Sequence, residues 1–281
     1  MPAETLKFEA RNLSRVFGHG KKLVHAVDGV TFHIKDREIV SLVGQSGCGK
    51  TVLAKTLLRL EKPTAGELFF NGKPIDAERD PRDHWRQVQA VFQDPFSAFN
   101  QFFTIRSQLK SSFTLFKQKP SEAEIEERVD NALRAVNIQP REIDGKFPFE
   151  LSGGQMQRML LARIFILKPQ VLIADEPTSM VDACSRASIL DYLMKLKKEL
   201  DMTIVFVTHD IGLAYYVSDR IFIMHKGKIA EQGAPDEVIQ TPKSDVTKQL
   251  LEDIPNIHHD WLGRGAKVPA KATVKQPEPA E

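Results

Sequence analysis

The sequence predicts an α/β fold in which helices cover a core sheet and a helical subdomain is inserted into that core. Short apolar runs typical of strands recur along the 281 residues, with helical patterns between them. A glycine-rich loop follows one of these runs and leads directly into a helix. Between Asp94 and Leu151 the strand pattern gives way to a phenylalanine-rich and then a charged helical segment.

Six apolar runs are expected to form strands. They are Ile39–Val43, Glu67–Phe70, Gln89–Phe92, Val171–Ala174, Thr203–Val207 and Arg220–Met224. The last run is followed by a turn at His225–Lys228 and by a further short strand. The inserted helices are expected at Ile105–Phe116 and Ser121–Val136.

These patterns divide the chain into five segments. We expect a core that spans residues 1–93 and resumes at 153–232, with the inserted helical subdomain at 94–152. A short helical extension follows at 233–261, and a tail at 262–281 completes the chain. The tail is rich in Pro, Ala, Lys and Glu and has little apolar surface to bury, so we expect it to be disordered.

The composition argues against several classes of protein. The 39 Lys and Arg residues nearly balance the 37 Asp and Glu residues, so a formal net charge of +2 implies no strong field toward nucleic acid or a membrane surface. Met1–Asn12 contains no apolar core of a signal peptide, and no run of about 18 apolar residues occurs anywhere. The two cysteines, Cys48 and Cys184, suit a reducing cytosol. Any membrane contact is therefore expected to come through a partner.

The glycine-rich loop is the first chemical motif. It matches the pattern G-x-x-x-x-G-K-[ST] with Gly44, Gln45, Ser46, Gly47, Cys48, Gly49, Lys50 and Thr51. Its glycines let successive backbone N–H groups point at phosphate oxygens, and the helix that follows adds its positive N-terminal end. Lys50 is expected to reach the outer phosphates, and Thr51 to offer its hydroxyl to Mg²⁺. The loop therefore predicts a P-loop NTPase, a class that includes kinases, GTPases and motors.

Cys48 in this loop has two alternative roles. Its small side chain could fill space beneath the loop. A thiol beside Lys50 at a helix N-terminus could instead be reactive, because both neighbours favour the thiolate.

A second motif selects the family. Between the glycine-rich loop and an acidic strand end lie Leu151, Ser152, Gly153, Gly154 and Gln155. Ser152 and Gln155 could simply form a capping box at an ordinary helix start. These five residues are, however, the signature of ABC ATPases, and the chain resembles that family from about Leu6 to Ile254. The resemblance implies the ABC ATPase architecture, a P-loop NTPase (RecA-like) core sheet with an inserted α-helical subdomain.

The resemblance also implies roles for residues outside these two motifs. The acidic strand end resembles a Walker B motif, in which Asp175 supports Mg²⁺ and Glu176 is the general base that polarises the attacking water. Gln93 matches the Q-loop glutamine, which senses Mg²⁺ and water, and His209 matches the switch histidine. Phe17 matches the aromatic residue that stacks on adenine, although a phenylalanine there could equally belong to the core. Ser179–Asp182 occupies the position of the D-loop.

Members of this family work in pairs. Each ATP is held by the P-loop of one subunit and the signature of the other, so Ser152, Gly153, Gly154 and Gln155 would act on ATP bound by the partner. The implied cofactors are ATP and Mg²⁺. The implied partners are a second ABC ATPase subunit, which is expected to differ in sequence from this chain, and two transmembrane permease subunits. An extracellular or periplasmic substrate-binding protein is an indirect partner, and no nucleic acid is expected. The chain is expected to be peripheral, on the cytoplasmic face of the cell membrane.

Several segments resemble one branch of the family. Gly145–Glu150 is similar to importers and differs from the Glu-rich segment of exporters, and Gln93–Asn100 resembles importers of the oligopeptide, dipeptide and nickel class. Met180–Ala183 is closer to members that import oligosaccharides. Many peptide-type relatives also carry a C-terminal cysteine cluster, whereas no cysteine follows Cys184 here. The resemblance therefore favours oligosaccharides over oligopeptides as the solute.

Two other functions are compatible with the motifs. One is a non-transport ABC ATPase acting on ribosomes or nucleic acid, but such proteins usually add a second cassette, coiled coils or zinc-binding cysteines. The other is an inactive partner subunit, which the intact set of catalytic residues disfavours. Four phenylalanines could form a base-stacking platform, a socket for a partner's coupling helix or part of the core: Phe96, Phe99, Phe102 and Phe103. No basic run is interleaved with them, which favours the socket.

Overall fold

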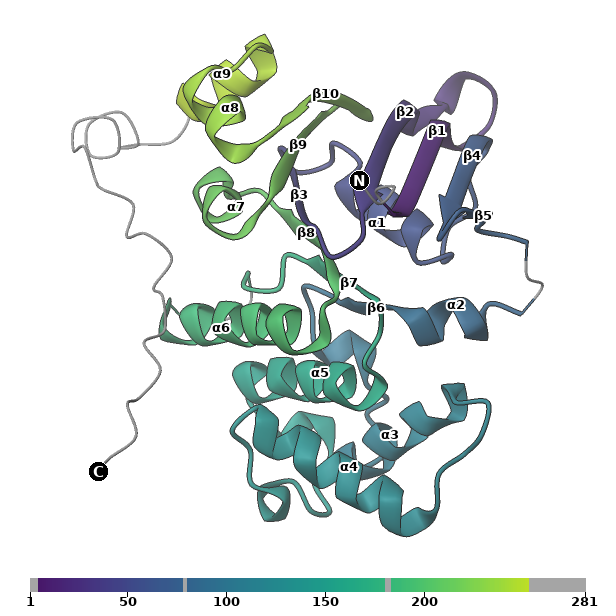
Figure 1. The fold of residues 1–281 in the computed structure, drawn as a ribbon, viewed down its shortest axis with the longest axis vertical. Helices are drawn as coiled ribbons and strands as arrows, with labels where there is room; N and C mark the ends of the chain where they lie inside the picture. The colour runs from purple at the N-terminus through teal and green to yellow at the C-terminus, as the bar shows by residue number, and fades with distance from the viewer. Residues whose placement is uncertain (1–4, 78–79, 180–182, 253–281) are drawn as a thin grey trace, which may run out of the picture.

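The core of the fold is a six-stranded sheet whose central strands are buried on both faces. The computed structural model describes residues 5–77, 80–179 and 183–252. Every residue of β3 (Ile39–Val43), β7 (Val171–Asp175) and β8 (Thr203–Thr208) is buried, as expected of central parallel strands. The strand order is β10-β9-β3-β8-β7-β6 (Figure 1). The outer strands are β6 (Val88–Val91), β9 (Arg220–His225) and β10 (Lys228–Gly233), of which β10 is antiparallel to its neighbour.

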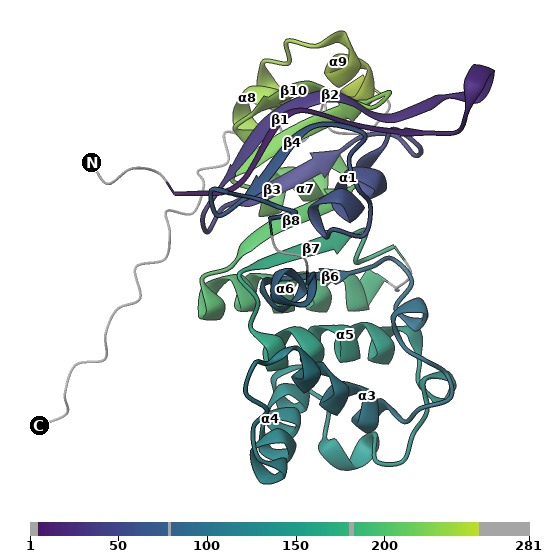
Figure 2. The same cartoon turned by 90° about the vertical axis from the view of Figure 1, so that its right-hand side faces the viewer.

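A second, antiparallel sheet packs over one face of the core. Its order is β2-β1-β4-β5, and its strands are β1 (Leu6–Phe17), β2 (Val24–Lys35), β4 (Ala65–Phe70) and β5 (Lys73–Pro74). A short 3-10 turn, Gly20–Lys22, joins β1 to β2 at the tip of a hairpin that projects from the body (Figure 2). Strands β1 and β2 were not predicted from the sequence, because only one face of each is buried and polar residues interrupt both apolar patterns.

Helices complete the core on both sides of the large sheet. They are α1 (Lys50–Leu57), α2 (Arg82–Gln87), α6 (Ala183–Leu200), α7 (Ile211–Val217), α8 (Pro235–Gln240) and α9 (Asp245–Glu252). The expected C-terminal extension is helical at α8 and α9, which pack on α7 and β9 through Val238 and Leu251. Its last part and the expected tail, 253–281, lie outside the described residues.

Three further helices form the lower part of the molecule in Figure 1. They are α3 (Ile105–Ser111), α4 (Glu122–Ala135) and α5 (Gly153–Leu167), and Thr104, Ser121 and Ser152 cap their N-termini. A 3-10 turn, Ser112–Leu115, completes the first expected helix. Helix α5 packs against both α4 and α6, so it joins the helical part to the core. The segment boundaries expected from the sequence stay predictions.

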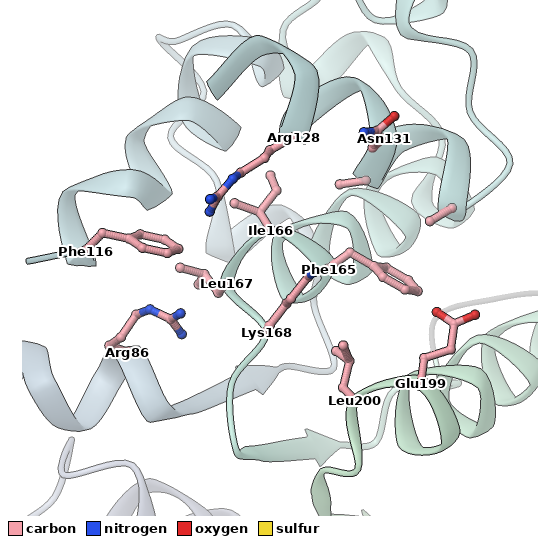
Figure 3. A pocket seen from close by; sticks show the side chains of 12 residues that line it. Arg86, Phe116, Arg128, Asn131, Phe165, Ile166, Leu167, Lys168, Glu199 and Leu200 are labelled. Carbon is pink, nitrogen blue, oxygen red and sulfur yellow. The ribbon is translucent and has the colours of Figure 1, made fainter. Parts of the chain in front are cut away.

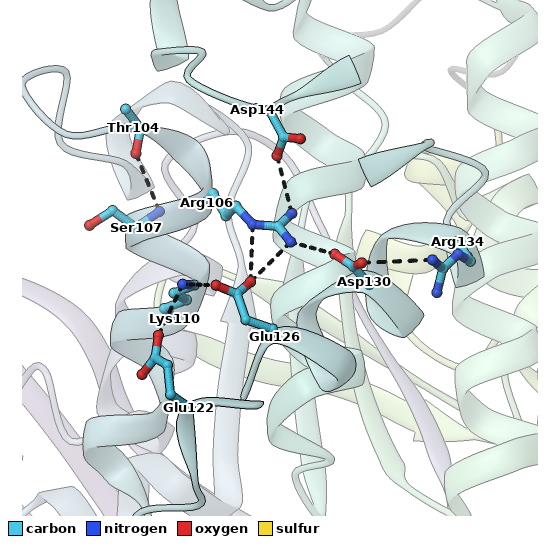
Figure 4. Close-up of polar contacts among 9 residues, drawn as sticks. All are labelled: Thr104, Arg106, Ser107, Lys110, Glu122, Glu126, Asp130, Arg134 and Asp144. Atoms are coloured by element: carbon cyan, nitrogen blue, oxygen red, sulfur yellow. Dashed lines mark hydrogen bonds and ion pairs between the residues drawn. The ribbon is translucent and has the colours of Figure 1, made fainter. Parts of the chain in front are cut away.

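An ion-pair network holds the helical part together (Figure 4). Arg106 on α3 lies 3.0 Å from Glu126 and 2.7 Å from Asp130, both on α4. It also lies 3.3 Å from Asp144, in the loop that leads toward α5. Lys110 adds contacts to Glu122 and Glu126. One guanidinium thus connects α3, α4 and the approach to the signature motif.

A buried histidine fixes the end of the helix that follows the glycine-rich loop. His84 Nε2 lies 2.9 Å from the carbonyl oxygen of Leu57, and the His84 ring meets Phe70 edge-on at 5.2 Å. Burial lowers the pKa of His84 from 6.5 to about 4. The neutral ring is therefore the native form.

This histidine is expected to make stability depend on pH. Between pH 6.5 and pH 4 the unfolded state binds a proton that the native state does not, so stability falls as pH falls. The free energy of unfolding of the wild type should drop by about 2 kcal/mol more between pH 7 and pH 5 than that of His84→Gln, which keeps a donor but does not titrate. Denaturant unfolding at the two pH values measures this difference. Equal pH dependence in both proteins would contradict a neutral buried His84.

Candidate active site

The glycine-rich loop connects β3 to α1 and closes around its own lysine. Lys50 is buried, and its ammonium group donates to the carbonyl oxygens of Gly44 at 2.7 Å and Gln45 at 3.0 Å. These carbonyl groups hold the cation at the mouth of the loop. Phosphate oxygens could therefore meet a positive charge that is already positioned there.

Two glycines are required by close backbone approach. A Cβ on Gly49, whose φ is +111°, would lie 2.0 Å from the carbonyl oxygen of Ala26 on β2. A Cβ on Gly44 would lie 2.2 Å from the carbonyl oxygen of Met224 on β9. Gly47, by contrast, has no atom near its missing side chain, so its surface stays open to a ligand. One side of the loop thus packs against β2 and β9, and the side at Gly47 is open.

Cys48 lies on the packed side of the loop. Its side chain is only 7% exposed and belongs to the apolar cluster under the antiparallel sheet. Its backbone N–H donates to the carbonyl oxygen of Gln45 at 3.3 Å, and its own carbonyl accepts from Gly227 at 2.9 Å. This geometry supports the space-filling role over a reactive, exposed thiol.

The acidic strand end lies beside the loop, because β7 and β3 flank β8 in one parallel sheet and end at the same edge. Asp175 is buried and accepts a hydrogen bond from the Thr51 hydroxyl. Burial raises the pKa of Asp175, and the neighbouring carboxylate of Glu176 adds to this, whereas the Thr51 hydrogen bond and Lys50 oppose it. A buried carboxylate beside a hydroxyl is a donor set that suits Mg²⁺ and would be stabilised by that charge.

Glu176 stands directly after β7 in a strained backbone conformation. Its φ is +46°, a left-handed value that non-glycine residues seldom adopt. Its backbone N–H donates to the carbonyl oxygen of Val207 at 2.9 Å, which fixes this conformation. His209, just after β8, places Nδ1 3.3 Å from Glu176 Oε1. The fold thus aims the expected base and the expected switch histidine at each other.

A cavity of about 330 Å³ brings seven of the expected site residues together. Its lining includes Lys50, Thr51, Gln93 and Glu176, with Ser46, Gly47 and Gly49 from the loop. Gln93 is exposed and reaches this cavity from the segment after β6. One space therefore joins the phosphate cradle to the candidate base and the Q-loop glutamine.

Part of this lining was not predicted from the sequence. Lys226 and Gly227, in the turn between β9 and β10, and His25 and Ala26 on β2 also face the cavity. Gly227 N–H donates to Cys48 O, so the turn supports the loop from the side. The turn itself was expected, but no sequence signal indicated that it lies against a loop so far away in the chain.

Phe17 is the last residue of β1 and does not line the cavity. Its cross-strand partner Val24 does, so the end of β1 lies beside the cavity. The guanidinium of Arg15 lies 4.3 Å from the centre of the Phe17 ring and is held by Glu61 at 2.7 Å. Stacking of adenine on Phe17 stays a prediction.

The signature residues lie apart from this cavity. Ser152 caps α5 and forms the capping box with Gln155, at 2.9 and 3.2 Å. None of Ser152, Gly153, Gly154 and Gln155 is in the cavity lining. Within the helix, Gln157 is buried and donates to the carbonyl oxygen of Pro177 at 2.9 Å, which ties α5 to the segment after Glu176. The D-loop residues Met180–Asp182 lie outside the described residues.

The fold and this site define a P-loop NTPase, because a lysine-bearing loop between β3 and α1 shares a cavity with the acidic end of β7. The ABC transporter family matches residues 27–179, more than half of the chain. The chain therefore belongs to the ABC transporter family, as an ATP-binding ATPase subunit of the importer class.

Known proteins resemble this chain both in sequence and in structure. The oligopeptide transport ATP-binding protein AppF of Bacillus subtilis is 37% identical over 235 residues, which cover 83% of this chain and 71% of AppF. The oligopeptide transport ATP-binding protein OppF of Escherichia coli is 34% identical over 252 residues, which cover 88% of this chain and 75% of OppF. The dimeric ATP-binding cassette MJ0796 bound to ADP and Pi superimposes with a TM-score of 0.74 at 27% identity, over 81% of this chain and 98% of that one. The structure of cbiO1 from Clostridium perfringens superimposes with a TM-score of 0.73 at 31% identity, over 90% of this chain and 98% of cbiO1.

Proposed function

We propose that the chain is the ATP-hydrolysing subunit of an importer of oligopeptides. The observation that carries the proposal is the single cavity that joins Lys50, Thr51 and Glu176 in a chain related to AppF and OppF. Both relatives are named for oligopeptide transport, so we propose this solute in place of the oligosaccharide that the sequence favoured. One of the two features behind that preference, Met180–Ala183, lies mostly outside the described part of the chain.

The site residues divide the chemistry among them. Lys50 neutralises charge on the outer phosphates, and Thr51 with Asp175 would hold Mg²⁺ there. Bound Mg²⁺ would neutralise charge that develops on the phosphates. Glu176 accepts the proton of the attacking water, and His209 orients Glu176 and the terminal phosphate. Gln93, which lines the same cavity, would contact the attacking water and the bound metal.

The transport cycle requires a second cassette. The separation of Ser152 from the cavity supports a composite site, in which this N-terminus of α5 meets ATP bound by a partner. MJ0796, which has a similar fold, was solved as a dimer with ADP and Pi. We propose a partner cassette of different sequence, as inferred from the importer branch.

Replacement of Ser152 by Arg is expected to separate binding from hydrolysis. The bulky cation would fill the partner's ATP position but leave the cavity of this chain intact, so ATP should bind the lone subunit normally. Turnover in the assembled pair should fall at least about tenfold, because the contacts across the interface are lost. Equilibrium binding and phosphate release measure the two effects. Loss of ATP binding by the lone variant would contradict the composite geometry.

Exposed aromatic side chains mark a surface for a permease subunit. Phe102 and Phe103 are 88% and 55% exposed, and Phe149 is 67% exposed and stacks on Phe147 at 5.6 Å. The segment that carries Phe102 and Phe103 is joined to the segment that carries Phe149 by a 2.9 Å hydrogen bond from Ile105 N to Lys146 O. Phe99 is instead buried against Arg163, so it belongs to the core. Such a patch supports docking of an apolar helix from a membrane-spanning partner.

This surface would place the chain at the cytoplasmic face of the membrane. No helix in the described ranges 5–77, 80–179 and 183–252 is long and apolar enough to cross a bilayer. We expect Phe102→Ser combined with Phe149→Ser to weaken permease binding by at least about tenfold, since the two side chains present large apolar areas. The ATP affinity of the isolated chain should not change. Co-purification with the permease measures the loss, and undiminished recovery would exclude this patch as the docking surface.

The solute is tested by stimulation of the assembled transporter. In proteoliposomes with the substrate-binding protein, oligopeptides should raise ATP turnover, and oligosaccharides of similar size should not. Stimulation by oligosaccharides alone would contradict the proposed solute, although it would leave the ATPase assignment in place.

A further inference from the structure

A second large cavity lies at the opposite edge of the core sheet from the active site. Its volume is about 640 Å³, and α2, α4 and the C-terminal ends of α5 and α6 surround it (Figure 3). The chain enters β6, β7 and β8 from these helix ends, whereas the glycine-rich loop and Glu176 follow the other ends of their strands. None of its lining residues belongs to the nucleotide cavity.

The charges around this cavity are mostly positive. Arg86, Arg128 and Lys168 line it, against one acid, Glu199. Glu199 lies 3.9 Å from Lys195, so it is already paired. Like charges brought together favour an anion between them.

Two of these cations share one aromatic ring. The guanidinium carbon of Arg86 lies 4.3 Å from the centre of the Phe116 ring, and that of Arg128 lies 5.9 Å from it. In Figure 3 the two side chains approach this ring from α2 and α4. Arg128 is paired with Glu124 at 2.5 Å, whereas the guanidinium of half-buried Arg86 makes no hydrogen bond or ion pair with any residue in the described part of the chain. Burial lowers the pKa of Arg86, and Arg128 adds to the effect.

Apart from Asn131, the rest of the lining is apolar. Phe165 and Leu200 are partly exposed in the wall, and the lining residues Ile166 and Leu167 are buried. A ligand with only a charged group would leave this wall in water. A ligand with only an apolar body would leave Arg86 without an acceptor.

We propose that this cavity binds a small organic anion with a flat apolar body, whose carboxylate or phosphate group lies between Arg86 and Arg128. The planar guanidinium of Arg86 presents paired N–H donors that match such an oxyanion, while its face stays on Phe116. The apolar body lies along Phe165 and Leu200. The site is separate from ATP hydrolysis and uses none of its residues.

Methyl NMR of the full chain tests the site locally. The methyl groups of Ile166, Leu167 and Leu200 line the cavity, so their signals separate binding here from binding at the exposed phenylalanines or the nucleotide site. The probes are 2-naphthoate and 2-naphthyl phosphate, with the uncharged 2-naphthamide as control, in the presence of saturating ADP.

At least one anionic probe should shift these methyl signals saturably and bind at least about tenfold more tightly than 2-naphthamide. Whichever anion binds more tightly identifies the headgroup. Arg86→Ala should weaken that binding at least about tenfold, and Arg86→Lys should restore part of it. Arg82→Ala, on the same helix but outside the cavity, should have no effect.

Three results would overturn the proposal. The methyl signals could fail to respond to both anions, the amide could bind as tightly as the anions, or Arg86→Ala could bind them unchanged. Methyl signals far from the cavity report whether Arg86→Ala is folded. If it is not, Arg86→Lys and the amide comparison still decide the outcome.

Discussion

Glu176→Gln is expected to lower ATP turnover by about two to four orders of magnitude while ATP binding is retained. Glutamine has the size of glutamate and can keep the backbone hydrogen bond to Val207, but it cannot take a proton from water. The carboxylate faces the cavity that holds Lys50 and Thr51, next to His209. The loss should therefore fall on the chemical step and should also prolong the closed, ATP-bound pair of cassettes.

Single-turnover phosphate release and ATP binding by the assembled pair measure these effects. Glu67→Gln, an exposed change on β4, is the matched control and should hydrolyse ATP normally. If Glu176→Gln turned over ATP at nearly the wild-type rate, the general base would have to lie elsewhere.

Lys50→Ala is expected to weaken ATP binding at least about 100-fold, because hydrogen bonds from a cation to phosphate are each worth about 1.5–3 kcal/mol. The change also removes the bonds to Gly44 and Gln45, which hold the loop closed around the ammonium group. Both effects act on the nucleotide-bound state before hydrolysis begins. The variant should therefore fail at binding, unlike Glu176→Gln.

Equilibrium titration with a fluorescent ATP analogue measures the affinity of the isolated chain. Lys62→Ala removes an exposed lysine beyond α1 and should bind as the wild type does. Unchanged affinity in Lys50→Ala would mean that the phosphates do not occupy the glycine-rich loop.

The strands of the core sheet could be predicted from sequence, because β3, β7 and β8 are buried throughout and consist mostly of apolar residues. β1 and β2 could not, since one face of each meets solvent and polar residues break the pattern. Phe17 therefore ends a strand that was not predicted from the sequence.

The candidate site was predictable where a local motif carries the chemistry, as in the glycine-rich loop and at Asp175 and Glu176. Contacts made by tertiary packing were not: the turn at Lys226 and Gly227 lies against the loop only because β9 pairs with β3. The strained φ of Glu176 likewise depends on the hydrogen bond to β8. Arg86, Arg128 and Phe116 come from three separate segments, and no sequence pattern predicts that both guanidinium groups lie against the Phe116 ring.

ATP hydrolysis by this chain is expected to drive membrane-spanning partners. The decisive experiment is to purify the complex from native membranes through a tag on this chain and to measure its ATP hydrolysis. We predict that membrane-spanning subunits and a second cassette accompany the chain and that the complex releases phosphate from ATP. Recovery of the chain without membrane-spanning subunits, with hydrolysis stimulated by nucleic acid instead, would contradict it.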